Sequence, residues 1–194
     1  MKNIAIFASG AGSNATKFVE YFKGHDNIRI SLIVSNKSSA KVLEMATQNN
    51  IPTQVISRDY FYKSEKVIED FAHYPIDFIV LAGFLWLIPE YLVKAFPNRI
   101  VNIHPALLPQ YGGKGMYGRH VHDSVHKAQE KQSGMTIHFV NEKYDEGNII
   151  FQATCNLTPE DTPQDIAQKV LQLEHQHYST VVDRLLTNSI SDPK

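Results

Sequence analysis

The chain is poor in cysteine, has no excess of charge of either sign and contains no hydrophobic run of membrane-spanning length. Its 194 residues include one cysteine, Cys155, which excludes an internal disulfide and favours a reducing compartment. Lys and Arg number 19 against 20 Asp and Glu, whereas nucleic-acid-binding proteins usually carry a basic excess. No apolar run approaches the roughly 20 residues of a membrane helix. We therefore expect a cytoplasmic protein that binds neither nucleic acid nor membrane.

Nothing in the sequence divides the chain, which has no internal repeat, low-complexity tract or linker. A length of 194 residues with 43% hydrophobic content suits one domain with its own core. The N-terminal apolar run 4–8 is too short for a signal peptide and predicts a first β-strand. We predict one domain over residues 1–188 and a frayed tail over residues 189–194.

Strand and helix patterns alternate over the first half of the chain. Apolar runs of strand length alternate with segments whose apolar residues recur at helical spacing. Strands are expected at residues 4–8, 28–34, 53–56, 78–82 and 100–103, and helices at residues 13–23, 40–48, 64–72 and 89–96. The segment 78–82 is apolar throughout, as in a parallel strand that is buried on both faces. This rhythm predicts an α/β fold with a doubly wound, mostly parallel sheet and a Rossmann-like N-terminal half.

The pattern changes in the second half. A helix, two alternating strands and a long amphipathic helix are expected at residues 121–129, 135–140, 148–157 and 162–186. The turn-rich segment 142–147 joins the two strands, and Thr162 with Asp165 forms a helix start signal. We therefore expect antiparallel C-terminal strands and a long C-terminal helix.

Asn102 and His104 lie two residues apart at the end of the predicted strand 100–103. Because side chains alternate along a strand, both can point into the same cleft. An amide N–H and an imidazole there could together hold a developing oxyanion. Pro105 follows and carries the chain off the sheet. The alternative is a strand end whose polar groups only cap a turn, since turns also favour Asn and Pro.

Glycines mark the connection between the first strand and the first helix, where Gly10-Ala11-Gly12-Ser13-Asn14-Ala15 matches G-x-G-x-x-A. Such a connection lets backbone N–H groups approach an anion at a helix N-terminus. A dinucleotide site would need an acidic residue at the end of the second strand, where this chain has Ser35-Asn36-Lys37. Because Ser13 and Asn14 supply further donors, we favour the phosphate of a small substrate. A dinucleotide, or a tight turn without a ligand, remains the alternative.

A third motif is the loop segment Tyr144-Asp145-Glu146-Gly147. An acid beside glycine is most often a turn residue. If the fold brings a carboxylate to His104, the carboxylate would raise the pKa of the imidazole and could relay a proton. Asp145 is the preferred candidate and Glu146 the alternative, because spacing alone does not choose between them.

Five segments occur in an order that is typical of one enzyme family. They are Gly12-Ser13-Asn14, Leu81-Ala82-Gly83-Phe84, Asn102-Ile103-His104-Pro105-Ala106-Leu107-Leu108-Pro109, His138-Phe139-Val140 and Asp145-Glu146-Gly147-Asn148-Ile149-Ile150. From about Lys2 to about Leu186 the sequence resembles the phosphoribosylglycinamide formyltransferases, the folate-dependent enzymes of purine synthesis. The Asn-x-His-Pro block is typical of the wider formyltransferase fold, and the Gly-Ser-Asn loop of the glycinamide ribonucleotide branch.

The resemblance implies a formyltransferase domain that uses 10-formyltetrahydrofolate as co-substrate and N1-(5-phosphoribosyl)glycinamide as acceptor, without a metal, as a monomer or homodimer. The implied catalytic set is Asn102, His104 and Asp145, supported by His138. The implied substrate-binding residues are Gly12, Ser13, Asn14, Leu171, Gln172, Leu173 and Glu174. The implied folate-binding residues are Leu85, Trp86, Leu87, Ile88, Asn102, Asn141, Glu142, Lys143, Tyr144 and Asp145.

Two features depart from the family. Trp86 stands where many relatives carry an arginine, so we expect the folate tail to be held differently, with Arg58 and Lys63 both in reach. The segment 111–119 is longer than in relatives and rich in glycine, which predicts a mobile loop on the substrate side.

His122 and His126 lie four residues apart, which is metal-ligand spacing, but we interpret them as part of a solvated helix. Two competing functions fit the sequence less well. A nucleotide-binding oxidoreductase would need the missing ribose-binding acid. A formyltransferase acting on an aminoacyl-tRNA or a sugar nucleotide usually carries an extra C-terminal domain, for which this chain has little room after residue 186.

Overall fold

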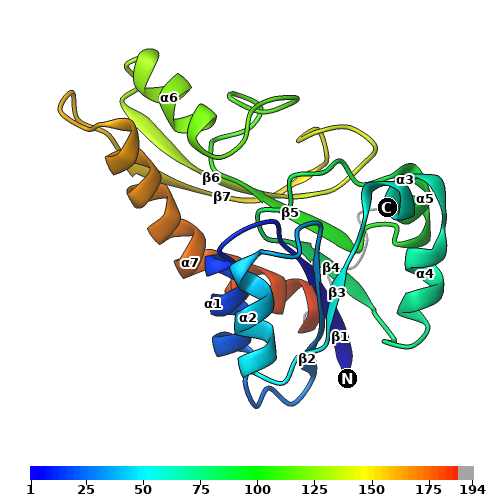
Figure 1. The fold of residues 1–194 in the computed structure, drawn as a ribbon. Helices are drawn as coiled ribbons and strands as arrows, with labels where there is room; N and C mark the ends of the chain where they lie inside the picture. The colour runs from blue at the N-terminus through cyan, green and yellow to red at the C-terminus, as the bar shows by residue number, and fades with distance from the viewer. Residues whose placement is uncertain (188–194) are drawn as a thin grey trace, which may run out of the picture.

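A seven-stranded sheet runs through the protein in the order β3-β2-β1-β4-β5-β6-β7, in a computed structural model that describes residues 1–187 (Figure 1). Five strands are parallel, namely β1 (Lys2–Phe7), β2 (Ile28–Ser35), β3 (Thr53–Val55), β4 (Phe78–Leu81) and β5 (Ile100–His104). The last two, β6 (Gln132–Phe139) and β7 (Ile149–Asn156), are antiparallel. The predicted doubly wound, mostly parallel sheet with antiparallel C-terminal strands is confirmed.

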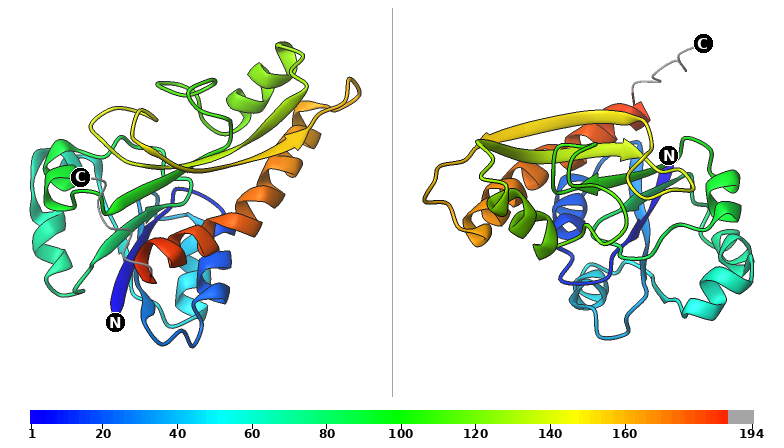
Figure 2. Two further views of the ribbon diagram at one scale, coloured as in Figure 1. Left: turned by 180° about the vertical axis from the view of Figure 1, so that it is seen from behind. Right: turned by 90° about the horizontal axis from the view of Figure 1, so that it is seen from above.

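Helices cover both faces of the sheet (Figure 2). One face carries α1 (Ser13–Tyr21), α2 (Lys41–Gln48) and the long α7 (Pro163–Thr187). The other face carries α3 (Arg58–Lys63), α4 (Lys66–Phe71) and α5 (Glu90–Ala95). A further helix, α6 (Arg119–Lys127), packs against α7 beyond the parallel strands. The predicted long C-terminal helix is therefore present.

Two apolar cores follow from the alternation of side chains along the buried strands. In β1, Ile4 and Ile6 belong to the core under α1, α2 and α7, whereas Ala5 and Phe7 belong to the core under α3, α4 and α5. The hydroxyl of the fully buried Tyr178 lies 3.0 Å from the Leu81 carbonyl oxygen at the end of β4. This contact fixes α7 across the sheet.

The strand order reverses between β1 and β4, because β1 leads outward to β2 while β4 leads the other way to β5. The connections that leave the carboxyl ends of β1 and β4 therefore diverge and open a crevice, which is where ligands bind in folds of this kind. The segment Gly10–Asn14 and the segment Ala82–Ile88 both start at this point. The sheet thus brings the predicted phosphate loop and the predicted folate segment to one place.

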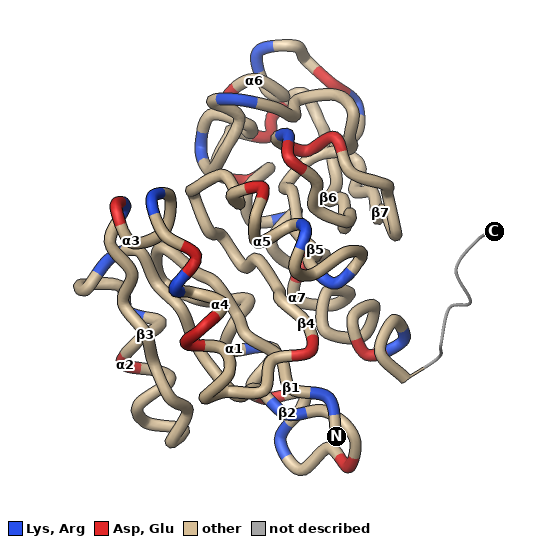
Figure 3. Tube along the Cα trace, turned by 90° about the vertical axis from the view of Figure 1, so that its right-hand side faces the viewer, with Lys and Arg blue, Asp and Glu red and all other residues tan. Residues whose placement is uncertain are grey.

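One helix of the structure was not expected from the sequence, and two sequence-based predictions concern the end of the chain. Helix α3 was not predicted, although Ser57 caps it by accepting a hydrogen bond from the Tyr60 N–H at 3.2 Å. The predicted frayed tail 189–194 lies outside the described residues, and the single-domain boundary at residue 188 stays a prediction. Within residues 1–187, no helix has the length and apolar character needed to span a bilayer. Basic and acidic residues are interspersed over the described chain (Figure 3).

Candidate active site

A cavity of about 1030 Å³ occupies the crevice at the carboxyl ends of β1, β4 and β5. Most of the residues predicted for the site line it. They are Gly12, Ser13, Asn14, Leu85, Trp86, Leu87, Ile88, Asn102, His104, His138, Lys143, Tyr144, Asp145, Leu171 and Glu174. Its volume is at the upper end of ordinary ligand pockets, so it is large enough for two small molecules side by side.

Four of the predicted site residues do not line this cavity. On α7, Leu171 and Glu174 face the cavity. Gln172 is exposed to solvent outside the cavity, and Leu173 packs on the apolar core. A contiguous segment cannot all face one side of a helix, because only residues three or four apart share a face. In the loop before Asp145, Asn141 and Glu142 also lie outside the cavity wall.

The carboxylate of Asp145 is the centre of a buried polar cluster. Its Oδ2 lies 3.5 Å from Nδ1 of His104 and accepts a hydrogen bond from the Gly113 N–H at 2.9 Å. Its Oδ1 lies 3.5 Å from both the Asn102 amide nitrogen and Nε2 of His138. The structure thus brings together the three side chains that the sequence singled out, and Asp145 rather than Glu146 meets His104.

His138 orients the amide of Asn102. Its Nδ1 donates to the Phe139 carbonyl oxygen at 2.8 Å, so in the neutral ring Nε2 carries the lone pair. That nitrogen accepts one N–H of Asn102 at 3.1 Å. The second N–H of Asn102 has only the 3.5 Å contact to Asp145, which is too long to hold it firmly. A ligand oxygen in the cavity can therefore compete for this donor.

His104 is held between two acceptors. Its Nε2 donates to the Tyr111 carbonyl oxygen at 2.7 Å, and its Nδ1 faces Asp145. Burial lowers the pKa of His104 below its usual value, although the Asp145 charge and the Tyr111 carbonyl both oppose the shift. The sequence predicted that the carboxylate would raise this pKa. Its effect has the predicted sign, but desolvation of the ring outweighs it.

The pKa of Asp145 is also lowered. Burial alone would raise it, but the neighbouring His138, the charge of His104 and the Gly113 N–H together outweigh burial. Asp145 takes a left-handed backbone conformation with φ 57°, and so does Tyr111 with φ 55°. Such strain in ordinary residues gathers at functional sites. Here both strained residues contact His104.

Gly147 lets the loop 141–147 fold back over the site. A Cβ at this position would lie 1.7 Å from the Phe139 carbonyl oxygen, which no side chain can accommodate. The close approach of the two backbones sets where Asp145 can sit. The glycine after the acidic pair is therefore a geometric requirement of the loop.

The predicted phosphate loop lies at the start of α1. Gly12 has φ 74°, and a Cβ there would lie 2.5 Å from a methyl carbon of Val42. Ser13 is exposed on the cavity wall. The side chain of Asn14 instead donates to Glu174 at 2.6 Å, and burial raises the pKa of that carboxyl group despite this bond. The sequence suggested the side chain of Asn14 as a phosphate donor, whereas one N–H of its amide is engaged by Glu174. The backbone N–H of Asn14 remains available to a phosphate.

The opposite wall is aromatic and apolar. The ring of Trp86 packs near those of Phe61 and Tyr62, with centroid separations of 5.8 and 5.9 Å. The guanidinium of Arg58 lies over Tyr62 at 5.3 Å and over Trp86 at 5.9 Å. Lys63, the other candidate for the folate tail, is paired with Asp59 on the surface at 3.0 Å. Of these two candidates, Arg58 is therefore the one that borders this wall.

Sequence reasoning missed two backbone contributions and misjudged one histidine. The Tyr111 carbonyl and the Gly113 N–H hold His104 and Asp145, and only the glycine content of segment 111–119 hinted at this. His122 was interpreted as part of a solvated helix, but it is 7% exposed and lines the cavity, whereas His126 is exposed. Among residues 1–187, no group of three His, Cys, Asp or Glu side chains is arranged to hold a metal ion.

Known proteins share this sequence and this fold. The model of the formyl transferase family matches residues 2–182. Phosphoribosylglycinamide formyltransferase of Arabidopsis thaliana, named as chloroplastic, is 43% identical over 97% of the chain, which spans 67% of that protein. The Bacillus subtilis phosphoribosylglycinamide formyltransferase is 35% identical, over 96% of the chain and 95% of its own length.

A solved structure of a protein with the same name has the same fold. The crystal structure of phosphoribosylglycinamide formyltransferase from Anaplasma phagocytophilum superimposes with a TM-score of 0.87 at 31% identity, covering 96% of this chain and 87% of its own. The family model, which matches residues 2–182, spans all strands of the sheet and every residue that lines the cavity. The chain therefore belongs to the formyl transferase family, and within it to the phosphoribosylglycinamide formyltransferases.

Proposed function

We propose that the protein transfers the formyl group of 10-formyltetrahydrofolate to the amine of N1-(5-phosphoribosyl)glycinamide, a step of de novo purine (IMP) biosynthesis. The observation that carries the proposal is the Asp145 carboxylate, which lies against both Asn102 and His104 between two unlike walls of one cavity. One wall has a glycine loop at a helix N-terminus, suited to a phosphate. The other wall is apolar and aromatic, suited to a folate.

The reaction exchanges one carbon–nitrogen bond for another. The amine nitrogen bonds to the formyl carbon, and the bond from that carbon to N10 of the folate breaks. The amine loses one proton and N10 gains one. Between these events the formyl oxygen carries negative charge, which the loosely held N–H of Asn102 and a protonated His104 stabilise. Asp145 receives the amine proton through a water and favours the charged form of His104.

The two ligands take opposite sides of this cluster. The phosphate lies on the backbone N–H groups from Gly12 to Asn14 and on the Ser13 hydroxyl, and Glu174 meets the ribose or the glycinamide end. The folate ring lies against the segment 85–88, with Lys143 and Tyr144 from the neighbouring loop over it. The tail carboxylates of the folate reach Arg58, since the arginine of many relatives is replaced by Trp86.

The direct test is an assay of the purified protein with both substrates. Mass spectrometry should detect a product heavier than the ribonucleotide by one formyl group in place of one hydrogen, together with tetrahydrofolate. In thermal melting, a reduced folate analogue should raise the melting temperature and NAD(H) should not. Stabilisation by NAD(H) without formyl transfer would contradict the proposal and favour an oxidoreductase.

Ser13→Ala should raise KM for the ribonucleotide about ten-fold while leaving KM for the folate unchanged, because a hydrogen bond to a charged group is lost. Steady-state kinetics with each substrate varied in turn measure the two KM values separately. Ser38→Ala, in an exposed loop, is the matched control. Equal losses for both substrates would mean that the loop has only a structural role.

Arg58→Ala should raise KM for a folate that carries its glutamate tail, because the cation that faces the carboxylates is removed. A folate analogue without the glutamate should be used equally well by the variant and the unchanged protein. Lys63→Ala should match the unchanged protein with both folates, since Lys63 is exposed and paired with Asp59. A larger loss in Lys63→Ala than in Arg58→Ala would reverse the assignment.

A cytoplasmic location and a monomeric or homodimeric state remain predictions. The single cysteine, Cys155, which is partly buried and free, is consistent with a reducing compartment. Size-exclusion chromatography with light scattering would measure the oligomeric state.

A further inference from the structure

His122 is a buried histidine of the cavity wall that the reaction above does not use. It lies on the inner face of α6 and is 7% exposed. Its Nδ1 is buried without a hydrogen-bond partner among the described residues. The neighbouring Asp123 turns outward to Arg119, at 3.4 Å. The imidazole therefore stands at the cavity with none of its hydrogen-bonding capacity met by the protein.

Burying an unpaired polar group costs free energy, and most buried polar groups in folded proteins have a partner. A histidine that only filled space on this helix could be replaced by an apolar residue, as at Val125 on the same face. Nδ1 is the buried nitrogen of this ring and faces no acceptor among the described residues, so the neutral ring carries its proton on Nε2. Nε2 makes no hydrogen bond within residues 1–187, and because the ring borders the cavity, a ligand can supply an acceptor for this N–H.

The position of α6 decides which ligand this is. The helix packs against α7, which carries Leu171 and Glu174 of the ribonucleotide wall. His122 is also close enough to His104 for the charge of that ring to lower its pKa, although burial is the larger cause. His122 thus lies near both the reacting end of the cavity and the ribonucleotide wall.

We propose that Nε2 of His122 donates a hydrogen bond to the carbonyl oxygen of the glycinamide unit of the substrate, an inference that rests on the proposed function. In the substrate, this amide joins the ribose to the carbon that bears the reacting amine. A neutral imidazole suits a neutral carbonyl acceptor. A phosphate would instead be matched by the charged Lys114 and Arg119, which also border the cavity. The hydrogen bond would hold the amine at the distance from Asp145 that attack requires.

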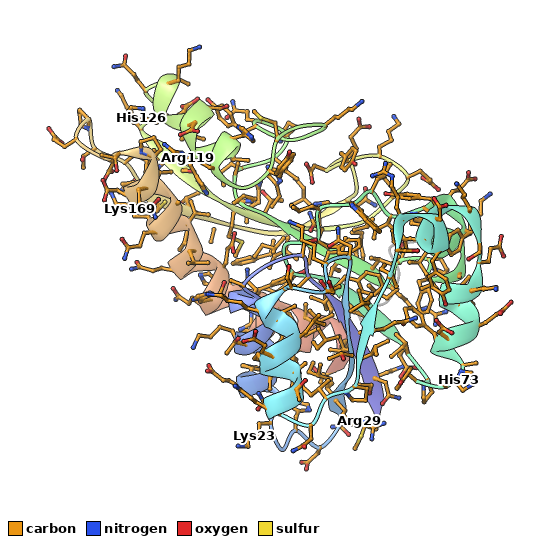
Figure 4. The ribbon with its side chains drawn as sticks, in the orientation of Figure 1. Lys23, Arg29, His73, Arg119, His126 and Lys169 are labelled. Atoms are coloured by element: carbon orange, nitrogen blue, oxygen red, sulfur yellow. The ribbon has the colours of Figure 1, made fainter. Side chains whose placement is uncertain are left out.

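Substitutions test the role in turnover. His122→Phe removes the donor and should raise KM for the ribonucleotide about ten-fold, with KM for the folate unchanged. His122→Gln retains an N–H donor and should recover part of the loss. His126→Ala is the matched control, because His126 is exposed. It lies near the C-terminal end of α6, whereas Arg119 begins the helix (Figure 4). An unchanged KM in His122→Phe would overturn the inference, while turnover by the unchanged protein would leave the proposed function intact.

Ligand binding to the unchanged protein gives a test that does not depend on a variant folding. In a protein with ¹⁵N-labelled histidine, the ribonucleotide substrate should shift the Nε2 resonance of His122, which His122→Gln identifies by its loss. Ribose 5-phosphate, which lacks the glycinamide, should bind without that shift. A full shift with ribose 5-phosphate would place the contact on the phosphoribosyl part, and no shift with the substrate would exclude any contact. Either result would overturn the inference.

Discussion

Asn102→Ala and His104→Ala are each expected to lower kcat by roughly 10²–10³, with the fold intact. Asn102→Ala removes an N–H donor to the oxyanion and His104→Ala removes the positive charge beside it, and losing one such group costs roughly 3–4 kcal/mol of transition-state stabilisation. Both side chains border the cavity at the end of β5, so we expect the loss to fall mainly on kcat. Single-turnover kinetics at saturating folate and ribonucleotide would measure the effect on the chemical step.

The control for this prediction is His73→Ala, since His73 is exposed, does not line the cavity and lies far from Arg119, which does (Figure 4). The double variant should lose less than the product of the two single losses, because both side chains act on one oxygen. If both single variants turned over at near-normal rates with unchanged melting temperatures, the assignment of the oxyanion site would be wrong.

Asp145→Asn is expected to reduce activity strongly and to shift its pH dependence. The carboxylate favours the charged form of His104, so its removal should lower further a pKa that burial already depresses. Activity that needs protonated His104 is present below that pKa and is lost as the pH rises through it. This limb of the pH profile should therefore move to lower pH in the variant. Loss of the proton acceptor should lower the maximum as well, by roughly 10²–10⁴.

Glu146→Gln is the matched control, because it removes the adjacent charge without touching His104. Glu146 is exposed and paired with Lys143 at 3.0 Å. Titration of His104 by NMR in both variants separates the two acids. An unchanged His104 pKa in Asp145→Asn, with a lowered one in Glu146→Gln, would show that the wrong acid had been chosen.

The part of the site that lies on β5 could be predicted from the sequence alone. The spacing of Asn102 and His104 fixes their common direction as soon as residues 100–104 form a strand. The place of Asp145 could not be derived in this way. It depends on the left-handed turn at Asp145 and on the contact of Gly147 with Phe139, neither of which leaves a periodic pattern.

On the helices, the structure departs from the sequence-based grouping of residues for one physical reason. Gln172 and Leu173 were grouped with Glu174 because the three are adjacent in the sequence, but successive helical residues point about 100° apart. His122 was grouped with His126 for their spacing of four, yet one is buried and the other exposed. Helix α6 is short, and which of its faces is buried depends on its contact with α7. Only the tertiary structure supplies that information.

The bond between Asn14 and Glu174 joins residues 160 positions apart in the chain. During synthesis, the strands and loops that make the folate wall emerge well before α7, whereas the ribonucleotide wall lacks half of its residues until α7 has been made. A prematurely terminated chain that ends before Glu174 would therefore contain the folate wall of the cavity but only part of the ribonucleotide wall. Because contacts between distant residues also form late in folding, catalytic competence should be among the last properties that the chain acquires.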